Sequence, residues 1–141
     1  MNFALKWMDF ALIWPKGSVE FSLLSAGTRI RPHCGPTNHK WRMHLGVLIP
    51  PGETASIRVG GLGNDATEAP AGGGGLPRRR AWKEGKVLLF DDSFEHEVVN
   101  DSEEAARVVL IVDVWHPLLT GGGQRDQVRR DFGWHAGALA A

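Results

Sequence analysis

The amino-acid sequence predicts a single all-β domain, folded as a sandwich, jelly roll or barrel. The first observation is a series of about eight short apolar or alternating runs with turn residues between them roughly every ten positions. The second is that little of the chain shows a helical repeat. The third is length, because 141 residues suffice for one domain with one hydrophobic core.

The first elements lie before residue 34. Residues 1–17 form an N-terminal edge segment. Its apolar run, residues 1–14, is ended by Pro15, so we expect a partly buried strand or helix at the edge of the domain. The main domain is predicted over residues 18–118. It begins with a strand over Val19–Leu24 and a second over Thr28–Arg31, joined by a turn at Gly27.

The middle of the domain contains the strand with the most polar residues. Period-2 alternation in the predicted strand Lys40–Ile49 puts Arg42 and His44 on one face and apolar side chains on the other. A Pro-Pro-Gly turn then leads to a short strand over Ala55–Val59.

Residues 60–77 form a glycine-rich insertion without periodicity, which we interpret as a flexible surface loop. Three consecutive arginines, residues 78–80, follow it. A solvated loop edge is the favoured interpretation of this run, and an anion contact is the alternative.

The last strands come in quick succession. Lys86–Phe90 is continuously apolar, which predicts a strand covered on both faces. His96–Asn100 is the next strand, and Ala106–Trp115 is the longest. Residues 119–141 form a tail in which Gln124–Phe132 has the composition of a short charged helix.

Composition excludes several functions. The chain has 16 basic and 16 acidic residues, so no net field attracts nucleic acid or an anionic membrane. The lone cysteine, Cys34, cannot form an internal disulfide. No apolar run reaches the length of about 20 residues that a membrane span needs, and no signal peptide is visible. We therefore expect a soluble protein, with the cytoplasm favoured.

Histidines at strand ends indicate a metal site. His33 closes one predicted strand and His96 opens another, and neutral imidazoles in such positions suit zinc, copper or iron. A lone histidine more often only hydrogen-bonds a neighbour. The presence of His44 and Arg42 on one side of a nearby strand favours the metal interpretation.

Arg107 begins a long apolar strand, so its guanidinium is expected to point into the core or a cavity. A buried guanidinium keeps its proton and needs an anion. One candidate is Asp113, which lies on the same face of the strand. The other is a carboxylate cosubstrate held by two hydrogen bonds. Spacing alone does not choose between them.

Five segments, taken in order, resemble the aspartyl/asparaginyl β-hydroxylase family of iron(II)- and 2-oxoglutarate-dependent dioxygenases. They are residues 32–38, 42–46, 82–86, 90–97 and 107–117. Together they span roughly residues 18–118. The resemblance implies a double-stranded β-helix, a cupin-like form of the jelly roll.

The resemblance also implies a set of site residues. Fe(II) is expected to bind His33 and His96 without a carboxylate ligand, since Gly35 stands where related enzymes have the acid of a His-x-Asp motif. Asp92 is expected to orient a metal-bound water or His96. The cosubstrate 2-oxoglutarate is expected to bind four further residues: Ser22, Arg42, His44 and Arg107.

The activity implied is hydroxylation of the β-carbon of Asp or Asn residues in a polypeptide, with succinate and CO₂ as coproducts. Two alternatives stay open. One is hydroxylation of a lipid or small molecule by the same residues. The other is a cupin-like binding module without catalysis.

Overall fold

The computed structural model describes residues 19–60 and 79–131. Its elements are β1 (Val19–Leu24), β2 (Thr28–His33), β3 (Lys40–Leu48), β4 (Ala55–Val59), β5 (Arg80–Ala81), β6 (Val87–Phe90), β7 (His96–Asn100), β8 (Arg107–Trp115) and α2 (Gly122–Asp131). The predicted all-β class is confirmed. The N-terminal segment, almost all of the glycine-rich insertion, and the end of the predicted helix lie outside the described residues.

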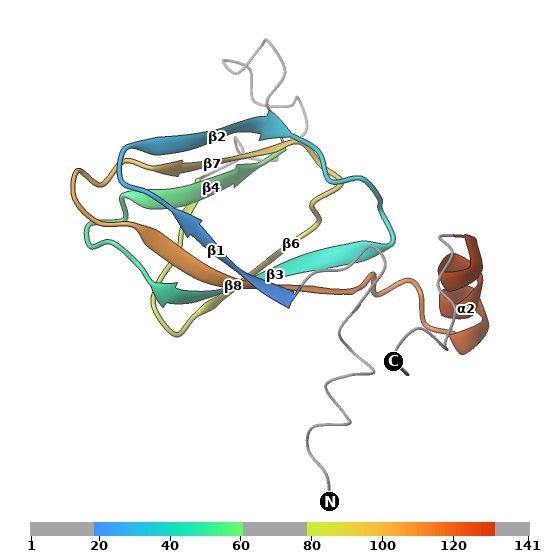
Figure 1. Cartoon of the computed structure of the whole chain (residues 1–141). Helices are drawn as coiled ribbons and strands as arrows, with labels where there is room; N and C mark the ends of the chain where they lie inside the picture. Colours follow the sequence, from blue (N-terminus) through green and yellow to red (C-terminus); the bar gives the residue numbers. More distant parts are fainter. Residues whose placement is uncertain (1–18, 61–78, 132–141) are drawn as a thin grey trace, which may run out of the picture.

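The strands form two four-stranded sheets. One has the order β1-β8-β3-β6 and the other β2-β7-β4-β5. Every pairing is antiparallel. The sheets face each other and enclose an interior between them (Figure 1). Apart from β4 and β5, which share a sheet, successive strands alternate between the two sheets. This is the jelly-roll arrangement, which confirms the expected double-stranded β-helix.

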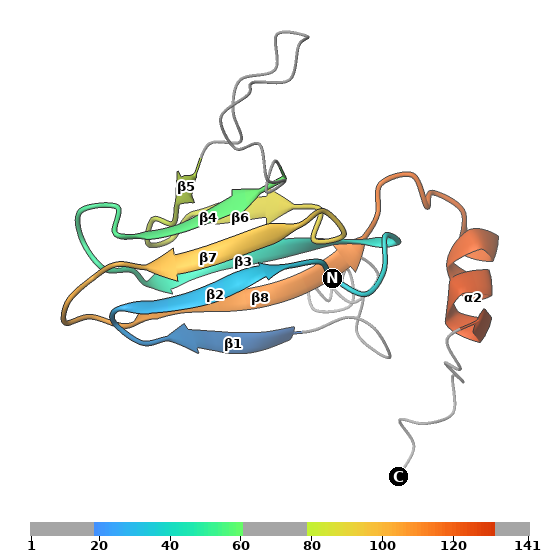
Figure 2. The same cartoon turned by 90° about the horizontal axis from the view of Figure 1, so that it is seen from above.

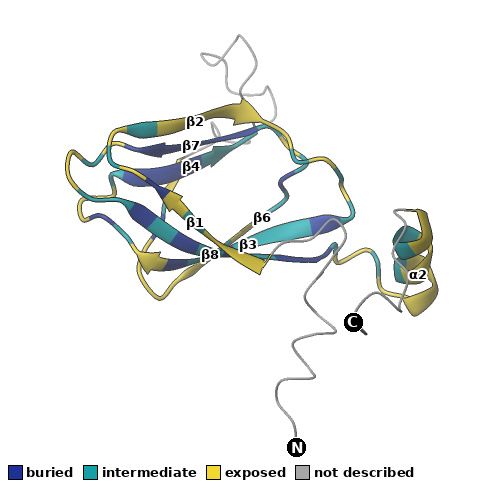
Figure 3. Ribbon diagram, in the orientation of Figure 1, coloured by how far each residue is buried: buried dark blue, intermediate teal, exposed yellow. Residues whose placement is uncertain are grey.

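The interior face of the first sheet follows from the β3–β8 register. Arg42 pairs with Asp113 and His44 with Ile111, so these side chains share one face. The apolar core between the sheets is built from seven buried residues: Leu24, Ala55, Ile57, Trp82, Val98, Val109 and Ile111. Figure 3 shows the buried residues concentrated on β7, β8 and the inner parts of β3 and β4.

The prediction that residues 86–90 are covered on both faces is wrong. The strand β6 is an edge strand of its sheet. Val87 is 51% exposed and Leu89 50% exposed, while Leu88 and Phe90 pack against the core. The continuous apolar run therefore covers two different faces. It misled because an exposed apolar face looks the same in sequence as a buried one.

The outer face of the first sheet carries further apolar side chains. Phe21 and Leu23 of β1 are 71% and 65% exposed. Phe21 pairs with Leu110, which pairs with Leu45, and that residue pairs with Val87. One row of this face is thus apolar across all four strands.

Arg79 and Arg80 are exposed, in agreement with the favoured interpretation of the run as solvated, but the run is not simply a loop edge. Arg79 forms an ion pair with the buried Glu97, which also contacts Arg58. Arg80 belongs to the two-residue strand β5, which the sequence did not predict. Arg78 lies outside the described residues.

The predicted charged helix is confirmed as α2, although it begins at Gly122 rather than Gln124. It stands beside the end of β8, apart from the two sheets (Figure 2). The guanidinium groups of Arg125 and Arg129 lie 5.9 and 5.5 Å from the Trp115 ring. In the part of the chain that the structure describes, no helix is long and apolar enough to cross a membrane.

Candidate functional site

Neighbouring strands bring His33 and His96 together. The two residues are register partners on β2 and β7, just after an irregularity between Ile30 and His33. Their ring centroids are 4.2 Å apart. His33 Nδ1 donates to the Arg31 carbonyl oxygen at 2.9 Å, and His96 Nδ1 donates to that of Phe94 at 2.8 Å.

These two hydrogen bonds fix the tautomers. A carbonyl oxygen can only accept, so Nδ1 of each ring carries a proton, and in a neutral imidazole Nε2 then has the lone pair. Two neighbouring rings, each anchored through Nδ1, match the way proteins present histidine ligands to a metal. Burial outweighs the hydrogen bond to Phe94 and lowers the pKa of His96, which favours its neutral form.

Asp92 lies against the chain segment that follows His33. Its carbonyl oxygen accepts a hydrogen bond from the Gly35 backbone at 2.6 Å. A Cβ atom on Gly35 would sit 2.6 Å from the Asp92 carboxyl carbon. The Asp92 carboxylate thus fills the space into which a side chain at position 35 would project. It is fully buried, and its Oδ1 has no hydrogen-bond partner.

An ion-pair network surrounds Asp92. Lys40 Nζ donates to Asp92 Oδ2 at 2.7 Å and lies 3.1 Å from Asp113 Oδ2. Arg42 donates to both carboxylate oxygens of Asp113, at 2.8 and 3.0 Å. Burial raises the pKa of Asp113, but the hydrogen bonds and charges of Arg42 and Lys40 outweigh it and hold that pKa below its usual range.

Arg107 is 1% exposed. Within residues 19–60 and 79–131, no ion pair connects it to a carboxylate. Of the two anions that the sequence offered for Arg107, Asp113 is therefore not its partner. Its Nη2 donates to Ser22 Oγ at 3.3 Å, while Nε and Nη1 have no partner. Burial lowers its pKa to about 10, which still leaves it charged at neutral pH.

His44 is a buried neutral imidazole. Burial, followed by the charges of Arg107 and Arg42, lowers its pKa to about 3. Neither ring nitrogen has a hydrogen-bond partner. One nitrogen is therefore a donor and the other an acceptor, and both face the interior without a protein partner.

A series of side-chain contacts connects these groups through the interior. The series runs through Arg107, Trp82, His44, Phe90, His96 and His33. The Arg107 guanidinium carbon is 4.9 Å from the Trp82 ring, and the successive centroids from Trp82 onward are 5.8, 5.0, 5.5 and 4.2 Å apart. The predicted site residues at the two ends of the interior thus belong to one contiguous arrangement.

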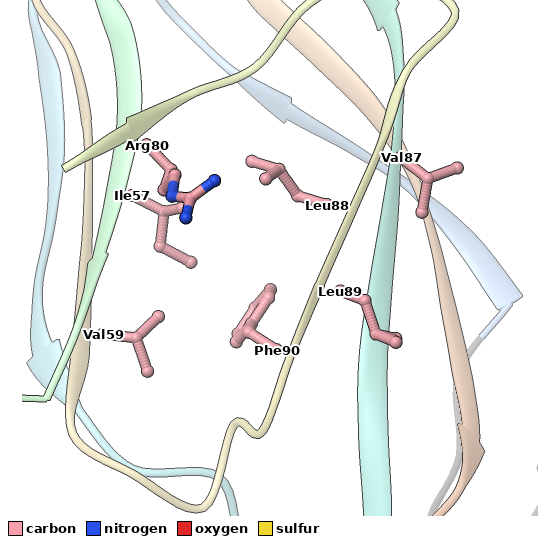
Figure 4. Close-up of a pocket in the computed structure, with 7 residues that line it drawn as sticks. All are labelled: Ile57, Val59, Arg80, Val87, Leu88, Leu89 and Phe90. Atoms are coloured by element: carbon pink, nitrogen blue, oxygen red, sulfur yellow. The ribbon is translucent and has the colours of Figure 1, made fainter. Parts of the chain in front are cut away.

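A groove of about 450 Å³ lies next to Phe90 of this series, between β6 on one side and β4 and β5 on the other. It is lined by Ile57, Val59, Arg80, Val87, Leu88, Leu89 and Phe90. Figure 4 shows Leu88 and Phe90 pointing towards Ile57 and Val59, with Val87 and Leu89 on the other side of the strand. The Phe90 ring lines the groove and contacts both His44 and His96, so one wall of the groove is next to these histidines.

The sequence interpretation missed two members of this interior. Lys40 is in phase with Arg42 and His44, so period 2 could have found it. Trp82 follows a two-residue strand, and no sequence pattern marks it as the ring between Arg107 and His44. Among the described residues, no three His, Cys, Asp or Glu side chains form a group able to hold a metal ion. The histidine pair is a two-residue arrangement.

Comparison with known proteins gives the family. A family model described as aspartyl/asparaginyl beta-hydroxylase matches residues 5–117. The chain belongs to the aspartyl/asparaginyl β-hydroxylase family. It is 47% identical over 105 residues to the mouse aspartyl/asparaginyl beta-hydroxylase, a match that covers 74% of this chain and 12% of that protein. The human protein of the same name is 46% identical over 105 residues, and this match also covers 74% of this chain and 12% of that protein.

Other family members are similarly close. The mouse aspartate beta-hydroxylase domain-containing protein 1 is 41% identical over 107 residues, covering 74% of this chain and 25% of that protein. The match therefore spans a quarter or less of these curated relatives. Among solved structures, a Cupin 2 conserved barrel domain protein from Salinispora arenicola CNS-205 matches with a TM-score of 0.46 and 16% identity, over 86% of this chain and 81% of that chain.

Proposed function

We propose that this family member is an Fe(II)- and 2-oxoglutarate-dependent dioxygenase that hydroxylates Asp or Asn residues of a polypeptide at the β-carbon. The observation that carries the proposal is the buried Arg107 guanidinium, which has no carboxylate partner within the described residues and shares the interior with two histidines anchored through Nδ1. A buried cation without a carboxylate partner calls for an anionic ligand.

The histidine pair fits an iron ion. Imidazole nitrogens suit iron among the common metals, and His33 and His96 would provide two of them. The unpartnered Asp92 Oδ1 is an acceptor that could orient a water in the metal site. A third protein ligand from position 35 is sterically blocked by Asp92. The remaining positions around the metal would therefore be left for cosubstrate and water.

The interior polar groups fit a dicarboxylate. Arg107 and Ser22 would hold the distal carboxylate of 2-oxoglutarate, using the donors Nε and Nη1 that have no protein partner. Arg42 and His44 would hold the carboxylate beside the ketone. Asp113 engages Nε and Nη2 of Arg42, which fixes the orientation of its guanidinium.

The chemistry supplied by bound iron, 2-oxoglutarate and O₂ is the oxidation of an unactivated C–H bond, with succinate and CO₂ as coproducts. The chain itself positions and neutralises. Arg107 balances carboxylate charge, the neutral His44 offers an N–H donor without adding charge, and the Trp82 ring keeps water from the guanidinium.

The polypeptide substrate is inferred from the relatives, whose names describe Asp and Asn hydroxylation. The groove favours a second candidate, hydroxylation of a small or lipid-like molecule. The side chains that line it are apolar apart from Arg80, so an apolar ligand with an anionic end suits it. A cupin-like binding module without catalysis is the third possibility that an experiment must separate.

The deciding experiment is visible absorption of the anaerobic protein with Fe(II), before and after adding 2-oxoglutarate. A weak charge-transfer band that requires 2-oxoglutarate is expected, and it should vanish in His33→Ala and His96→Ala. Exposure to O₂ with candidate substrates then follows, with mass spectrometry detecting one added oxygen atom in a peptide or in a lipid. Absence of both iron and 2-oxoglutarate binding by folded protein would leave only the binding module.

A further inference from the structure

Lys40 is buried to an unusual degree for a lysine. It is 1% exposed at the start of β3, on the same face as Arg42 and His44. Lysine is almost never fully buried without a charged partner. Here the ammonium contacts both buried acids, Asp92 Oδ2 at 2.7 Å and Asp113 Oδ2 at 3.1 Å.

The two cations of the network have different tasks. Arg42 engages Asp113 with two hydrogen bonds, and its Nε is 3.5 Å from Asp92 Oδ2. The direct hydrogen bond to Asp92 comes from Lys40. An ammonium with three donors on a flexible stem can reach two carboxylates in different directions.

The environment of Asp92 leaves its carboxylate little freedom. Lys40 holds Oδ2, and the Gly35 backbone packs against the carboxyl carbon. Oδ1 is buried and has no partner. Among the described residues, the loss of the lysine would leave Oδ2 only the longer contact with Arg42 Nε, at 3.5 Å, so the carboxylate could rotate away from its present orientation.

We propose that Lys40 is the positioning residue for Asp92, and that it holds this carboxylate in one orientation beside the segment that follows His33. This inference rests on the metal site of the proposed function, and it concerns a residue to which that proposal gives no task. Lys40 acts through Asp92 in this account and contacts neither metal nor cosubstrate.

The test is a double-mutant cycle between Lys40→Met and Asp92→Asn in the full chain. The probe is Co(II) under anaerobic conditions without 2-oxoglutarate, and the readout is its dissociation constant from calorimetry. Each single variant is expected to weaken Co(II) binding roughly 10- to 100-fold, as the loss of groups that orient metal ligands does. The double variant should bind no more weakly than Asp92→Asn alone.

Non-additivity is the decisive result, since residues that act through one another do not add. If Lys40→Met weakens binding by the same factor with and without Asp92, Lys40 acts independently and the inference is wrong. Unchanged affinity in Lys40→Met also overturns it. Lys83→Met is the matched control, because the Lys83 side chain is 68% exposed and its contact with Glu53 is long, at 3.6 Å. Its affinity should equal that of the unmodified protein.

Two further outcomes are covered. If Lys40→Met does not fold, the double variant should recover folding, because it removes both charges of the pair. Failure to recover would contradict the inference. If the unmodified protein binds no Co(II), the proposed function fails separately. The denaturant midpoints of the same four proteins then decide, and additive shifts would show that Lys40 does not hold Asp92.

Discussion

At the scale of single residues, the buried Arg107 guanidinium is the most unusual group of the interior. Its charge is buried, and within residues 19–60 and 79–131 only its Nη2 has a protein acceptor, the Ser22 hydroxyl. The Trp82 ring and this one hydrogen bond compensate the burial of the charge only in part, which is why we propose an anionic ligand for it. The same applies on a smaller scale to His44, whose two ring nitrogens are buried without partners.

Substitution of Arg107 by methionine should separate stability from binding. We expect 2-oxoglutarate to bind about 10- to 100-fold more weakly, because a charge-assisted contact worth about 1.5–3 kcal/mol is lost. The free energy of unfolding without cosubstrate should not fall, since an unpaired buried charge is removed. Titration calorimetry and urea denaturation measure the two effects, with the exposed Arg29→Met as control. Unchanged 2-oxoglutarate affinity would remove Arg107 from the site.

His44 should make the fold sensitive to acid. Its pKa is about 3 in the folded chain and 6.5 when exposed, so between these values the unfolded chain binds a proton that the folded chain does not. Stability contributed in this way is complete above pH 6.5 and is lost as pH falls below it. At pH 5.5 the loss relative to pH 8 is about 1.4 kcal/mol.

His44→Gln removes this titrating group. Urea denaturation at pH 8 and at pH 5.5 should show that the variant loses less stability on acidification than the unmodified protein does. An equal loss in both proteins would mean that His44 is protonated in the folded state.

At the scale of elements, β6 shows how alternation survives in an entirely apolar strand. Leu88 packs on the core, whereas Leu89 is 50% exposed. Leu88→Ala should cost about 2 kcal/mol of unfolding free energy. Leu89→Ala should cost less than about 1 kcal/mol. Urea denaturation of the two variants tests this, and equal losses would indicate a strand covered on both faces.

The segment after β2 and the turn before β7 meet at Gly35 and Asp92. Gly35→Ala places a Cβ 2.6 Å from the Asp92 carboxyl carbon and 2.9 Å from its carbonyl oxygen. We expect a loss of about 1–3 kcal/mol in unfolding free energy, as overpacking produces. Gly35→Asp should likewise fail to provide a third metal ligand, since Asp92 fills that space. Tighter Co(II) binding by Gly35→Asp would contradict this account.

At the scale of the whole molecule, the two faces of the first sheet differ sharply. The inner face carries the charged network, and the outer face exposes apolar side chains on its edge strands β1 and β6. A double substitution, Phe21→Ser with Leu89→Ser, should reduce the binding of an apolar fluorescent dye. The midpoint of unfolding should move little, because exposed side chains contribute little to stability. A large drop in that midpoint would show that this face is covered in solution.

Much of the fold could be predicted from local pattern. Alternation located β3 and placed Arg42 and His44 on one face. The turn residues put His33 at the end of one strand and His96 at the start of another, as in the structure. The short strand β5 could not be predicted, because two residues are too few for a period. Nor could the partner of Asp113: the sequence offered Arg107 for it, whereas the β3–β8 register puts Arg42 opposite it.

The sequence by itself determined the all-β class, the order of the strands, the resemblance to the aspartyl/asparaginyl β-hydroxylases and the residue types of the interior. Tertiary structure alone decided how those residues meet. It made His33 and His96 neighbours, paired Asp92 with Lys40, and left Arg107 without a carboxylate partner among residues 19–60 and 79–131. Period and composition act along the chain over a few residues. The pairing of charges depends instead on the register between strands that are distant in the sequence. Arg42 and Asp113, for example, are 71 residues apart along the chain.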